Sequence, residues 1–375
     1  MRRRDFVGAV AGAGVLAIPA RAVGERVAIA RCMDYGASLM PALRTMMDQI
    51  GGLSRIVKGK TVAMKVNLTG SSTWRLSYAP IEHTHWTHPA VVGALVRLMG
   101  EAGARRVRIL ESAWQTADPL EEVMLEAGWE PRHILNAAAR VEMENTNWLG
   151  RAKTYRRFTP PNGGHMFPAY MLNHSYEDCD VFVSVAKLKE HATAGVTMSL
   201  KNLFGIAPCT IYGDGAGTDE PTATPKGGRG AVFHFGRRQP AKIAPAENDP
   251  ASSREAGYRV PRIVADLCAA RPIHLAIIDG IYSMHGGEGP WNRGVGIVKP
   301  GLLIAGTNPV NTDAVGASLM GFDPMAGRGT APFETCDNTL ELAEQHAVGT
   351  RDLSKIEVVG VPIEKARTRY REVRS

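Results

Sequence analysis

The segment from Lys187 to Gly205, KLKEHATAGVTMSLKNLFG, gathers side chains that can bind an anion. It contains three lysines, Lys187, Lys189 and Lys201, and a single carboxylate, Glu190, to balance them. Residues two apart lie on the same side of an extended chain, as Lys187 and Lys189 would. Ammonium groups without carboxylates are favourable where a bound anion or water compensates them. The segment therefore predicts a site for a carboxylate or a phosphate, and a solvated positive edge is the alternative.

The same segment also contains groups that can transfer a proton. His191 titrates near neutral pH when unperturbed, and burial can lower the pKa of a lysine far enough to make it a base. Thr197 and Lys201 are four residues apart, so they share a side in a strand and in a helix alike. We therefore expect His191 and Lys201 to be catalytic. The residues expected to bind substrate here are Lys187, Lys189, Thr197 and Asn202.

Two further segments have metal-ligand residue types. HTHWTH contains His83, His85 and His88, and IDGIYSMHGGEGPW places His285 and Glu288 on a glycine-rich stretch after Asp279. Neutral imidazoles and carboxylates are ligands for divalent metals, and an Asp–His or Asp–Glu pair can also act in general acid–base catalysis. A helix cap and a solvated turn are the alternatives. We assign the histidines and Glu288 to a metal site and Asp279 to catalysis.

Polar residues follow several apolar runs of the chain. Polar residues stand where five runs of β-forming residues end: Asn67, Glu111-Ser112, Lys187, Asp279 and Asn308. Ligands of open parallel sheets bind outside the carboxyl ends of the strands, so these residues are expected to converge on one crevice. Asn67 and Asn308 are accordingly expected to bind substrate, with ordinary capping of a helix as the alternative for Asn308.

Alternating strand and helix patterns predict an α/β fold, with a largely parallel sheet flanked by helices. Helices are expected to begin at His88-Pro89 and Asn308-Pro309 and to occupy RVPRIVADLCAA, residues 259–270. The expected strands are residues 61–67, 105–112, 180–186, 274–280, 301–307 and 355–360.

Residues from about 205 to 258 differ from the rest because they are dense in Gly, Pro, Ser and Thr. The stretch is too long for an ordinary connection between elements. It predicts an insertion within a single domain of residues 23–375, either a lid over the site or a mobile segment without a role.

The first 22 residues have the pattern of an export signal, with a basic start, a short apolar run and the small-residue end Ala20-Arg21-Ala22. Arg3-Arg4 followed by Phe6 is similar to the twin-arginine pattern, which predicts the twin-arginine export machinery as a partner and a periplasmic location.

The sequence argues against three classes of protein: nucleic-acid-binding proteins, membrane-spanning proteins and iron–sulfur proteins. The net charge of +7 falls to +4 once the four arginines and one aspartate of residues 1–22 are removed, and no basic stripe with aromatics occurs, so nucleic acid is not an expected partner. No later apolar run is long enough to span a membrane. The five cysteines are at least 30 residues apart, so no cysteine-ligated iron–sulfur cluster is expected.

Several ordered motifs resemble the family of the domain of unknown function 362. They include VNLTG, VAKLKEHATAGVTMSLKNLFGIAP and LLIAGTNPVNTDAVGASLMGFDP, and the resemblance covers residues from about 60 to 360. Some members have ferredoxin-like cysteine motifs, which this sequence lacks.

EHATAGVTMSLKNLFGIA is also similar to a stretch of nickel-pincer lactate racemases. That similarity implies proton transfer by His191 and attachment of a cofactor at Lys201, ten residues later. Ser199-Leu200 replaces the glycine pair of that family, which speaks against covalent attachment.

Together these patterns predict an exported enzyme that acts on a small anionic substrate with a divalent metal or a metal-containing cofactor. The alternative is a non-catalytic periplasmic protein that binds a ligand or a cofactor in the same crevice.

Overall fold

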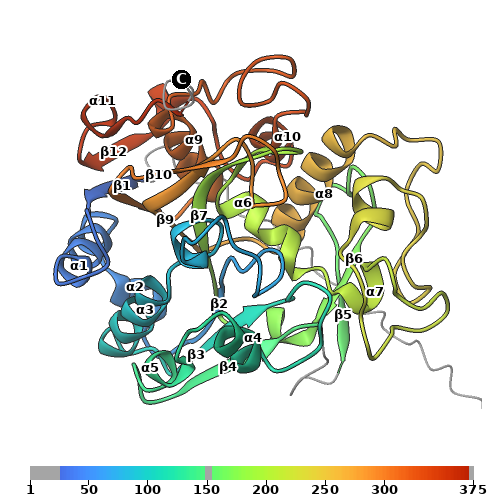
Figure 1. Ribbon diagram of the computed structural model, residues 1–375, viewed down its shortest axis with the longest axis horizontal. Helices are drawn as coiled ribbons and strands as arrows, with labels where there is room; N and C mark the ends of the chain where they lie inside the picture. Colours follow the sequence, from blue (N-terminus) through green and yellow to red (C-terminus); the bar gives the residue numbers. More distant parts are fainter. Residues whose placement is uncertain (1–25, 148–153, 371–375) are drawn as a thin grey trace, which may run out of the picture.

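The computed structural model describes residues 26–147 and 154–370, which include a ten-stranded sheet between two layers of helices (Figure 1). The main path of the sheet runs β12-β1-β11-β9-β7-β2-β3-β4, with β8 paired to β7 and β10 paired to β9. The strands of this sheet are β1 (Arg26–Arg31), β2 (Thr61–Lys65), β3 (Arg106–Glu111), β4 (Val141–Asn145), β7 (Val181–His191), β8 (Gly195–Thr197), β9 (Leu275–His285), β10 (Gly296–Val298), β11 (Leu302–Gly306) and β12 (Glu357–Gly360). A separate hairpin consists of β5 (Tyr155–Phe158) and β6 (Tyr170–Asn173).

Strand direction divides the sheet into a parallel part and a mixed part. β4, β3, β2, β7 and β9 are parallel to their neighbours in this order. β11 is antiparallel to both β9 and β1, and β12 is parallel to β1. The predicted α/β class with a largely parallel sheet is confirmed.

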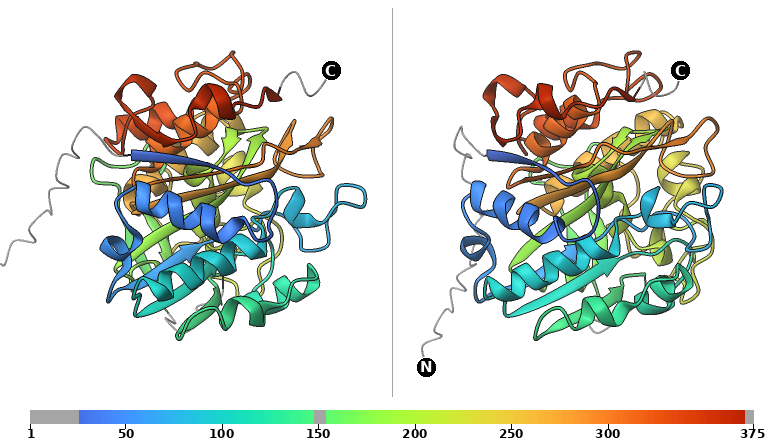
Figure 2. Two further views of the ribbon diagram at one scale, coloured as in Figure 1. Left: turned by 90° about the vertical axis from the view of Figure 1, so that its left-hand side faces the viewer. Right: turned by 60° about the vertical axis from the view of Figure 1, so that its left-hand side comes forward.

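Both faces of the sheet are buried. Alternate residues of a strand point to opposite faces, so Val183 of β7 belongs to the same core as Leu43 and Leu95, whereas Phe182 belongs to the core of Val264 and Val315. The helices on the Val183 face are α1 (Leu39–Gln49), α2 (Leu53–Val57), α3 (Pro89–Glu101), α4 (Leu120–Glu126) and α5 (Pro131–Leu135). Those whose buried residues join the other core are α6 (Ser199–Asn202), α7 (Cys209–Tyr212), α8 (Ala256–Ala270), α9 (Pro309–Leu319), α10 (Thr339–Gln345) and α11 (Ile363–Ala366). Figure 2 shows α1 and α3 in front of the strands on the first face.

Several predicted helix starts match the structure. The side chain of His88 accepts a hydrogen bond from the backbone N–H of Ala90 at the start of α3, and Pro89 is the first helical residue. Asn308 caps α9 in the same way and is again followed by proline. Helix α8 spans the predicted 259–270 and begins three residues earlier.

The ends of two strands differ from the prediction. β7 continues to His191 and β9 to His285, because these strands pair with each other and with β8 and β10 beyond the body of the sheet. Lys187 and Asp279 are opposite one another inside this ladder, so neither is a strand end. β1, β4 and the short strands β5, β6, β8 and β10 were not predicted.

The stretch 205–258 is packed onto the domain. It contains η4 (Gly230–His234), in which Phe233 is fully buried against Tyr212 and Phe204. Glu247 forms a buried ion pair with Arg259 of α8, with 2.5 Å between Oε1 and Nη2. These contacts tie the insertion to α8.

Residues 1–22, the predicted export signal, lie outside the described residues. Among residues 26–147 and 154–370, no helix combines the length and the apolar character that crossing a membrane requires.

Candidate functional site

A small polar cavity of about 60 Å³ lies at the carboxyl ends of β2 and β3, next to α6. It brings together three of the predicted site residues, Asn67, Lys201 and Asn202. The other residues that line it are Lys65, Leu68, Thr69, Gly70, Glu111, Ser112, Trp114, Phe204, Gly205 and Arg229.

A buried ion pair forms one wall of this cavity. The Nζ atom of Lys65 is 2.7 Å from Oε1 of Glu111, and both side chains are at most 4% exposed. Lys65 also donates to Oδ1 of Asn202, and Oε2 of Glu111 accepts from the backbone N–H of Leu68. Burial lowers the pKa of Lys65 and the carboxylate of Glu111 opposes this shift. The charges of these two residues therefore compensate each other.

Lys201 and Arg229 have no such compensation. Among the described residues, no carboxylate lies within ion-pair distance of either cation. Arg229, from the insertion, donates to the carbonyls of Ala207 and Ser112, and Nζ of Lys201 lies 4.1 Å from the centre of the Phe204 ring. Burial lowers the pKa of Lys201 to about 7, the carboxylate of Glu288 acts to raise it, and the charges of Arg229 and Lys65 add smaller lowering effects. The cavity therefore has a surplus of positive charge.

Asn67 supplies an acceptor without a partner in this cavity. Its Oδ1 atom is buried and has no hydrogen-bond partner, and the residue is 6% exposed. An unsatisfied buried polar atom costs about 1–3 kcal/mol, so such an atom is a candidate contact for a ligand.

Asp313 of α9 fixes the helix on which Lys201 lies. Its two carboxylate oxygens accept hydrogen bonds from the backbone N–H groups of Ser199 and Leu200, each at 2.9 Å. Burial raises the pKa of Asp313 to about 7 in spite of these bonds. Asp313 therefore acts on the site through α6, as a positioning residue.

Lys187 and Asp279 lie together, but in the core. The Nζ atom of Lys187 is 3.0 Å from Oδ2 of Asp279, and both side chains are fully buried. Tyr35 donates to the same carboxylate, and Lys187 also donates to the carbonyl of Glu82 at 2.7 Å. Burial lowers the pKa of Lys187 and raises that of Tyr35. The predicted open anion-binding wall is therefore a closed ion pair at these two positions.

Lys189 has a similar anchoring contact. It is fully buried and donates to the carbonyl of His85 at 2.6 Å. Two lysines of β7 thus hold the segment 81–88 through backbone carbonyls. Thr197 of β8 is directly opposite Lys189 in the hairpin, and its Oγ1 is buried without a hydrogen-bond partner.

The three histidines of HTHWTH do not converge on one point. His83 stacks on Tyr282, with 4.2 Å between ring centres, and His88 stacks on Tyr35. The Nδ1 atom of His88 is occupied by the helix cap, and His85 instead meets the edge of Trp291.

His191 and Glu288 lie near each other, with 3.6 Å between Nδ1 and Oε2. The Nδ1 atom of His191 accepts the backbone N–H of Thr193, and burial lowers the pKa of the ring. Burial acts to raise the pKa of Glu288, but His191 and several hydrogen bonds lower it to about 2. With Nδ1 accepting this bond, Nε2 is the ring nitrogen that is left to exchange a proton, and the acid–base role of His191 stays a prediction.

Asn308 lies at the opposite end of the strands from Asn67. Because β11 is antiparallel to β9, its carboxyl end at Gly306 pairs with Ala276 near the start of β9. The Asn308 side chain caps α9 and donates to the carbonyl of Val348. The expected convergence with Asn67 therefore fails, and the capping alternative is what the structure shows.

The predicted metal ligands are not gathered into one set. Within residues 26–147 and 154–370, one group of three or more histidine, cysteine or acidic side chains has its donor atoms close enough for one ion. It consists of His165, Asp266 and His346, none of which was predicted.

Some residues of the cavity were missed by sequence reasoning. Lys65 lies two residues before Asn67 and so on the same face of the strand, a signal that a charged residue within an apolar run offers. Arg229 gave no such signal, because only the packing of the insertion brings it to the cavity.

One curated protein is similar in sequence to about half of this chain. A thylakoid-associated protein, sll1697, of Synechocystis sp. is 29% identical over 187 residues, which are 49% of this chain and 51% of that protein. The chain thus spans about half the length of this curated relative.

Two solved structures are similar at lower levels. The lactate racemase apoprotein from Thermoanaerobacterium thermosaccharolyticum has a TM-score of 0.36 and 15% identity, over 70% of this chain and 50% of that one. A protein from Thermotoga maritima has a TM-score of 0.34 and 16% identity, over 72% of this chain and 55% of that one. At these values neither likeness carries a conclusion about activity.

The sequence profile described as Domain of unknown function (DUF362) matches residues 62–318, which contain β3, β7, β9, α6 and every residue that lines the cavity. This match covers more than half of the chain, and the chain belongs to the DUF362 family.

Proposed function

We propose that the protein is an enzyme that acts on a small substrate with a carboxylate or phosphate group, bound in the cavity beside Lys201. The surplus of positive charge carries this proposal, because Lys201 and Arg229 face the cavity while Glu111 is already paired with Lys65. A bound anion would compensate Arg229 and the protonated form of Lys201, and charge-assisted hydrogen bonds of this kind are about twice as strong as neutral ones.

Lys201 is also the group best suited to transfer a proton in this cavity. Its pKa of about 7 leaves a large fraction of the neutral amine at neutral pH, which is the condition for an efficient general base. Asn67 Oδ1 would accept a hydrogen bond from a hydroxyl or amine of the same substrate. The substrate class is then a small anion with a donor group beside the charge.

The size of the cavity limits what it can bind. Pockets for whole small molecules are typically about 300–1,000 Å³, whereas about 60 Å³ admits a group the size of a carboxylate or phosphate. A nucleotide-sized metal cofactor does not fit this space, and the five predicted metal ligands are not together. The proposal therefore involves no step through such a cofactor.

Anion binding by matched lysine variants tests the proposal. Calorimetric titration of the full chain with inorganic phosphate and with small 2-hydroxy and 2-amino carboxylates should give binding that Lys201→Met weakens about 10- to 100-fold, the value of one charge-assisted hydrogen bond. Lys242→Met is the control, because Lys242 is 74% exposed and pairs with Asp219 in the same insertion. Equal affinities of wild type and Lys201→Met would exclude the site.

A non-catalytic anion-binding protein is the second candidate. One observation favours it: Lys65 and Glu111 neutralise each other, so Lys201 has no second uncommitted acid or base beside it in the cavity. The two candidates are separated by NMR, which follows exchange of the Cα proton of a 2-hydroxy or 2-amino carboxylate for deuterium. Exchange that depends on Lys201 supports the enzyme, and tight binding without exchange supports the binding protein.

We also propose export by the twin-arginine route, which the Arg3-Arg4 pattern supports. Residues 1–30 fused to a reporter should deliver it to the periplasm, and replacement of both arginines by lysine should retain it in the cytoplasm. Delivery that does not depend on Arg3 and Arg4 would contradict the route.

A further inference from the structure

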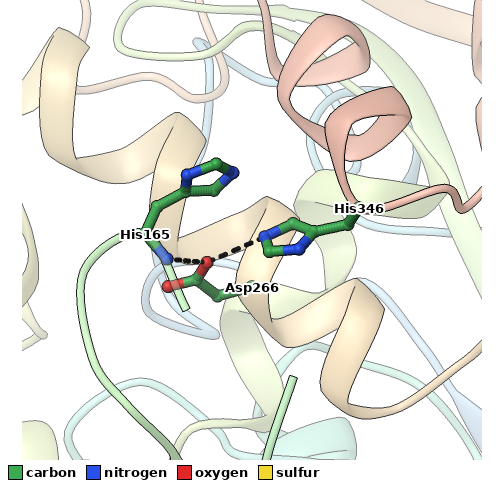
Figure 3. Close-up of side chains that lie close together, drawn as sticks. All are labelled: His165, Asp266 and His346. Carbon is green, nitrogen blue, oxygen red and sulfur yellow. Dashed lines mark hydrogen bonds and ion pairs between the residues drawn. The ribbon is translucent and has the colours of Figure 1, made fainter. Parts of the chain in front are cut away.

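A second cluster of ligand-type side chains lies away from the cavity. His165 comes from the connection between β5 and β6, Asp266 from α8, and His346 from the end of α10. Their donor atoms all lie within 4.8 Å of one another. Figure 3 shows the Asp266 carboxylate joined to the backbone nitrogen of His165 and to the ring of His346, and the two imidazole rings lie next to each other with 4.4 Å between their centres. Three segments that are distant in sequence thus meet at one point.

The carboxylate of Asp266 is fixed by four hydrogen bonds. Oδ2 accepts from the backbone N–H of Met166 and from the hydroxyl of Tyr170, at 3.0 and 2.7 Å. Oδ1 accepts from the backbone N–H of His165 at 2.6 Å and lies 3.1 Å from Nε2 of His346. Asp266 is fully buried, so Oδ1 is held toward His346. Hydrogen bonds of this kind orient the ligands of known metal sites.

His165 has a ring nitrogen that is free to bind a ligand. Its Nε2 atom is buried and has no hydrogen-bond partner. A neutral imidazole with its lone pair on Nε2 is a form that binds metals.

The spacing is compatible with a single ion. Ligand atoms about 2.0–2.2 Å from a tetrahedral Zn²⁺ lie roughly 3.4 Å from one another. The observed limit of 4.8 Å therefore requires the ligand atoms to approach one another by at most about 1.4 Å. Both histidines lie outside helices; His165 is partly exposed, and the side chain of His346 is 5% exposed.

The charges around the cluster also fit a cation. Asp266 contributes one negative charge and the two imidazoles are neutral ligands. The nearby cation, Arg262, is paired with Asp337, with Nη1 and Oδ2 in direct contact. A divalent ion would thus meet one carboxylate and little uncompensated positive charge.

We propose that His165, Asp266 and His346 bind a divalent transition-metal ion of the Zn²⁺ type. The ligand atoms are Nε2 of each histidine and Oδ1 of Asp266, and water supplies the remaining position. Two nitrogens and one oxygen suit Zn²⁺ and its first-row neighbours better than Mg²⁺ or Ca²⁺. The ion would cross-link the β5–β6 connection, α8 and the end of α10, which is a stabilising role separate from the cavity beside Lys201.

Metal binding by ligand variants tests this site. The full chain is stripped with a chelator, and its Zn²⁺ affinity is measured by competition with a fluorescent chelator. Loss of an outer hydrogen bond already weakens metal sites about 10- to 100-fold, so His165→Gln should weaken Zn²⁺ binding at least about 100-fold. His174→Gln is the matched control, because His174 is also partly exposed and pairs with a carboxylate, Glu177, at 3.2 Å; it should bind like wild type.

Cobalt gives a direct signature of the same ligands. Co²⁺ added to the stripped wild type should produce visible absorption bands of a low-coordinate site, which His165→Gln and His346→Gln should each lose. Urea unfolding without metal shows whether a variant is folded, and the backbone N–H of residue 165 still holds Asp266 in His165→Gln. If wild type takes up no more Zn²⁺ than His165→Gln, or if the Co²⁺ bands are the same in both, the proposal is wrong. The cluster then only connects its three segments through hydrogen bonds.

Discussion

Replacement of Lys187 by methionine distinguishes a buried ion pair from an open anion site. Methionine keeps most of the side-chain volume and removes the ammonium group. In the structure this leaves the Asp279 carboxylate without its cation in a fully buried position, and the carbonyl of Glu82 without its donor. Breaking a buried pair from one side typically costs about 3–5 kcal/mol. Lys187→Met should therefore lose a large part of the roughly 5–15 kcal/mol by which a domain is stable.

Urea unfolding at pH 7, followed by circular dichroism, measures this loss. Lys187→Met/Asp279→Asn should recover at least about 1 kcal/mol relative to the single variant, because it no longer buries an unpaired charge. An amide oxygen in the position of Oδ2 can still accept from the Tyr35 hydroxyl and from the backbone N–H of His88, because both donate to Oδ2 of the carboxylate. Lys242→Met should change stability by no more than about 0.5 kcal/mol, since its ion pair is exposed.

Two results would refute this reasoning. A cost below about 1 kcal/mol for Lys187→Met would mean that the ammonium group is solvated. A stable Lys187→Met that has lost anion binding would restore the open anion-binding wall that the sequence suggests. If the single variant does not fold, recovery in the double variant still decides between the two interpretations.

Three further predictions concern the cavity beside Lys201. The pKa of Lys201 is about 7 in the folded chain and 10.5 ordinarily, so between these pH values the unfolded chain binds more protons than the folded chain. Raising the pH from about 7 to about 9.5 should therefore increase the stability of wild type relative to Lys201→Met. Urea unfolding at both pH values measures this change, and a solvated Lys201 would give none. Gly205→Ala should cost about 1–3 kcal/mol, since its Cβ would lie 2.7 Å from Oε1 of Glu111 and 2.8 Å from Nζ of Lys65, whereas Gly327→Ala meets nothing within 4 Å and should be neutral in the same thermal unfolding assay. Asp313→Asn should cost about 1–2 kcal/mol and weaken phosphate binding, because an amide cannot accept from both Ser199 and Leu200; unchanged affinity in calorimetry would separate α6 from the site.

The sequence indicated the fold class and the starts of α3 and α9 because those features depend on local patterns. Alternating β-branched runs and a cap followed by proline are properties of a few neighbouring residues. It failed for β1 and β4, whose short runs gain their stability from pairing with distant strands. It also placed the ends of β7 and β9 too early, because their continuation depends on pairing with each other.

The candidate site shows the same division. Composition and spacing alone were enough to show that the region from Lys187 to Asn202 holds too many cations for its carboxylates, and that Asn67, Lys201 and Asn202 are polar residues beside buried strands. Which cations are compensated became clear from the folded chain: Asp279 pairs with Lys187, Glu111 pairs with Lys65, and Lys201 is left facing the cavity. The packing also sets the direction of β11, which places Asn308 at the other end of the strands. It likewise brings together His165, Asp266 and His346. Charge compensation and metal ligation act over a few ångströms in space, between residues that are far apart along the chain, and local sequence patterns therefore do not reveal them.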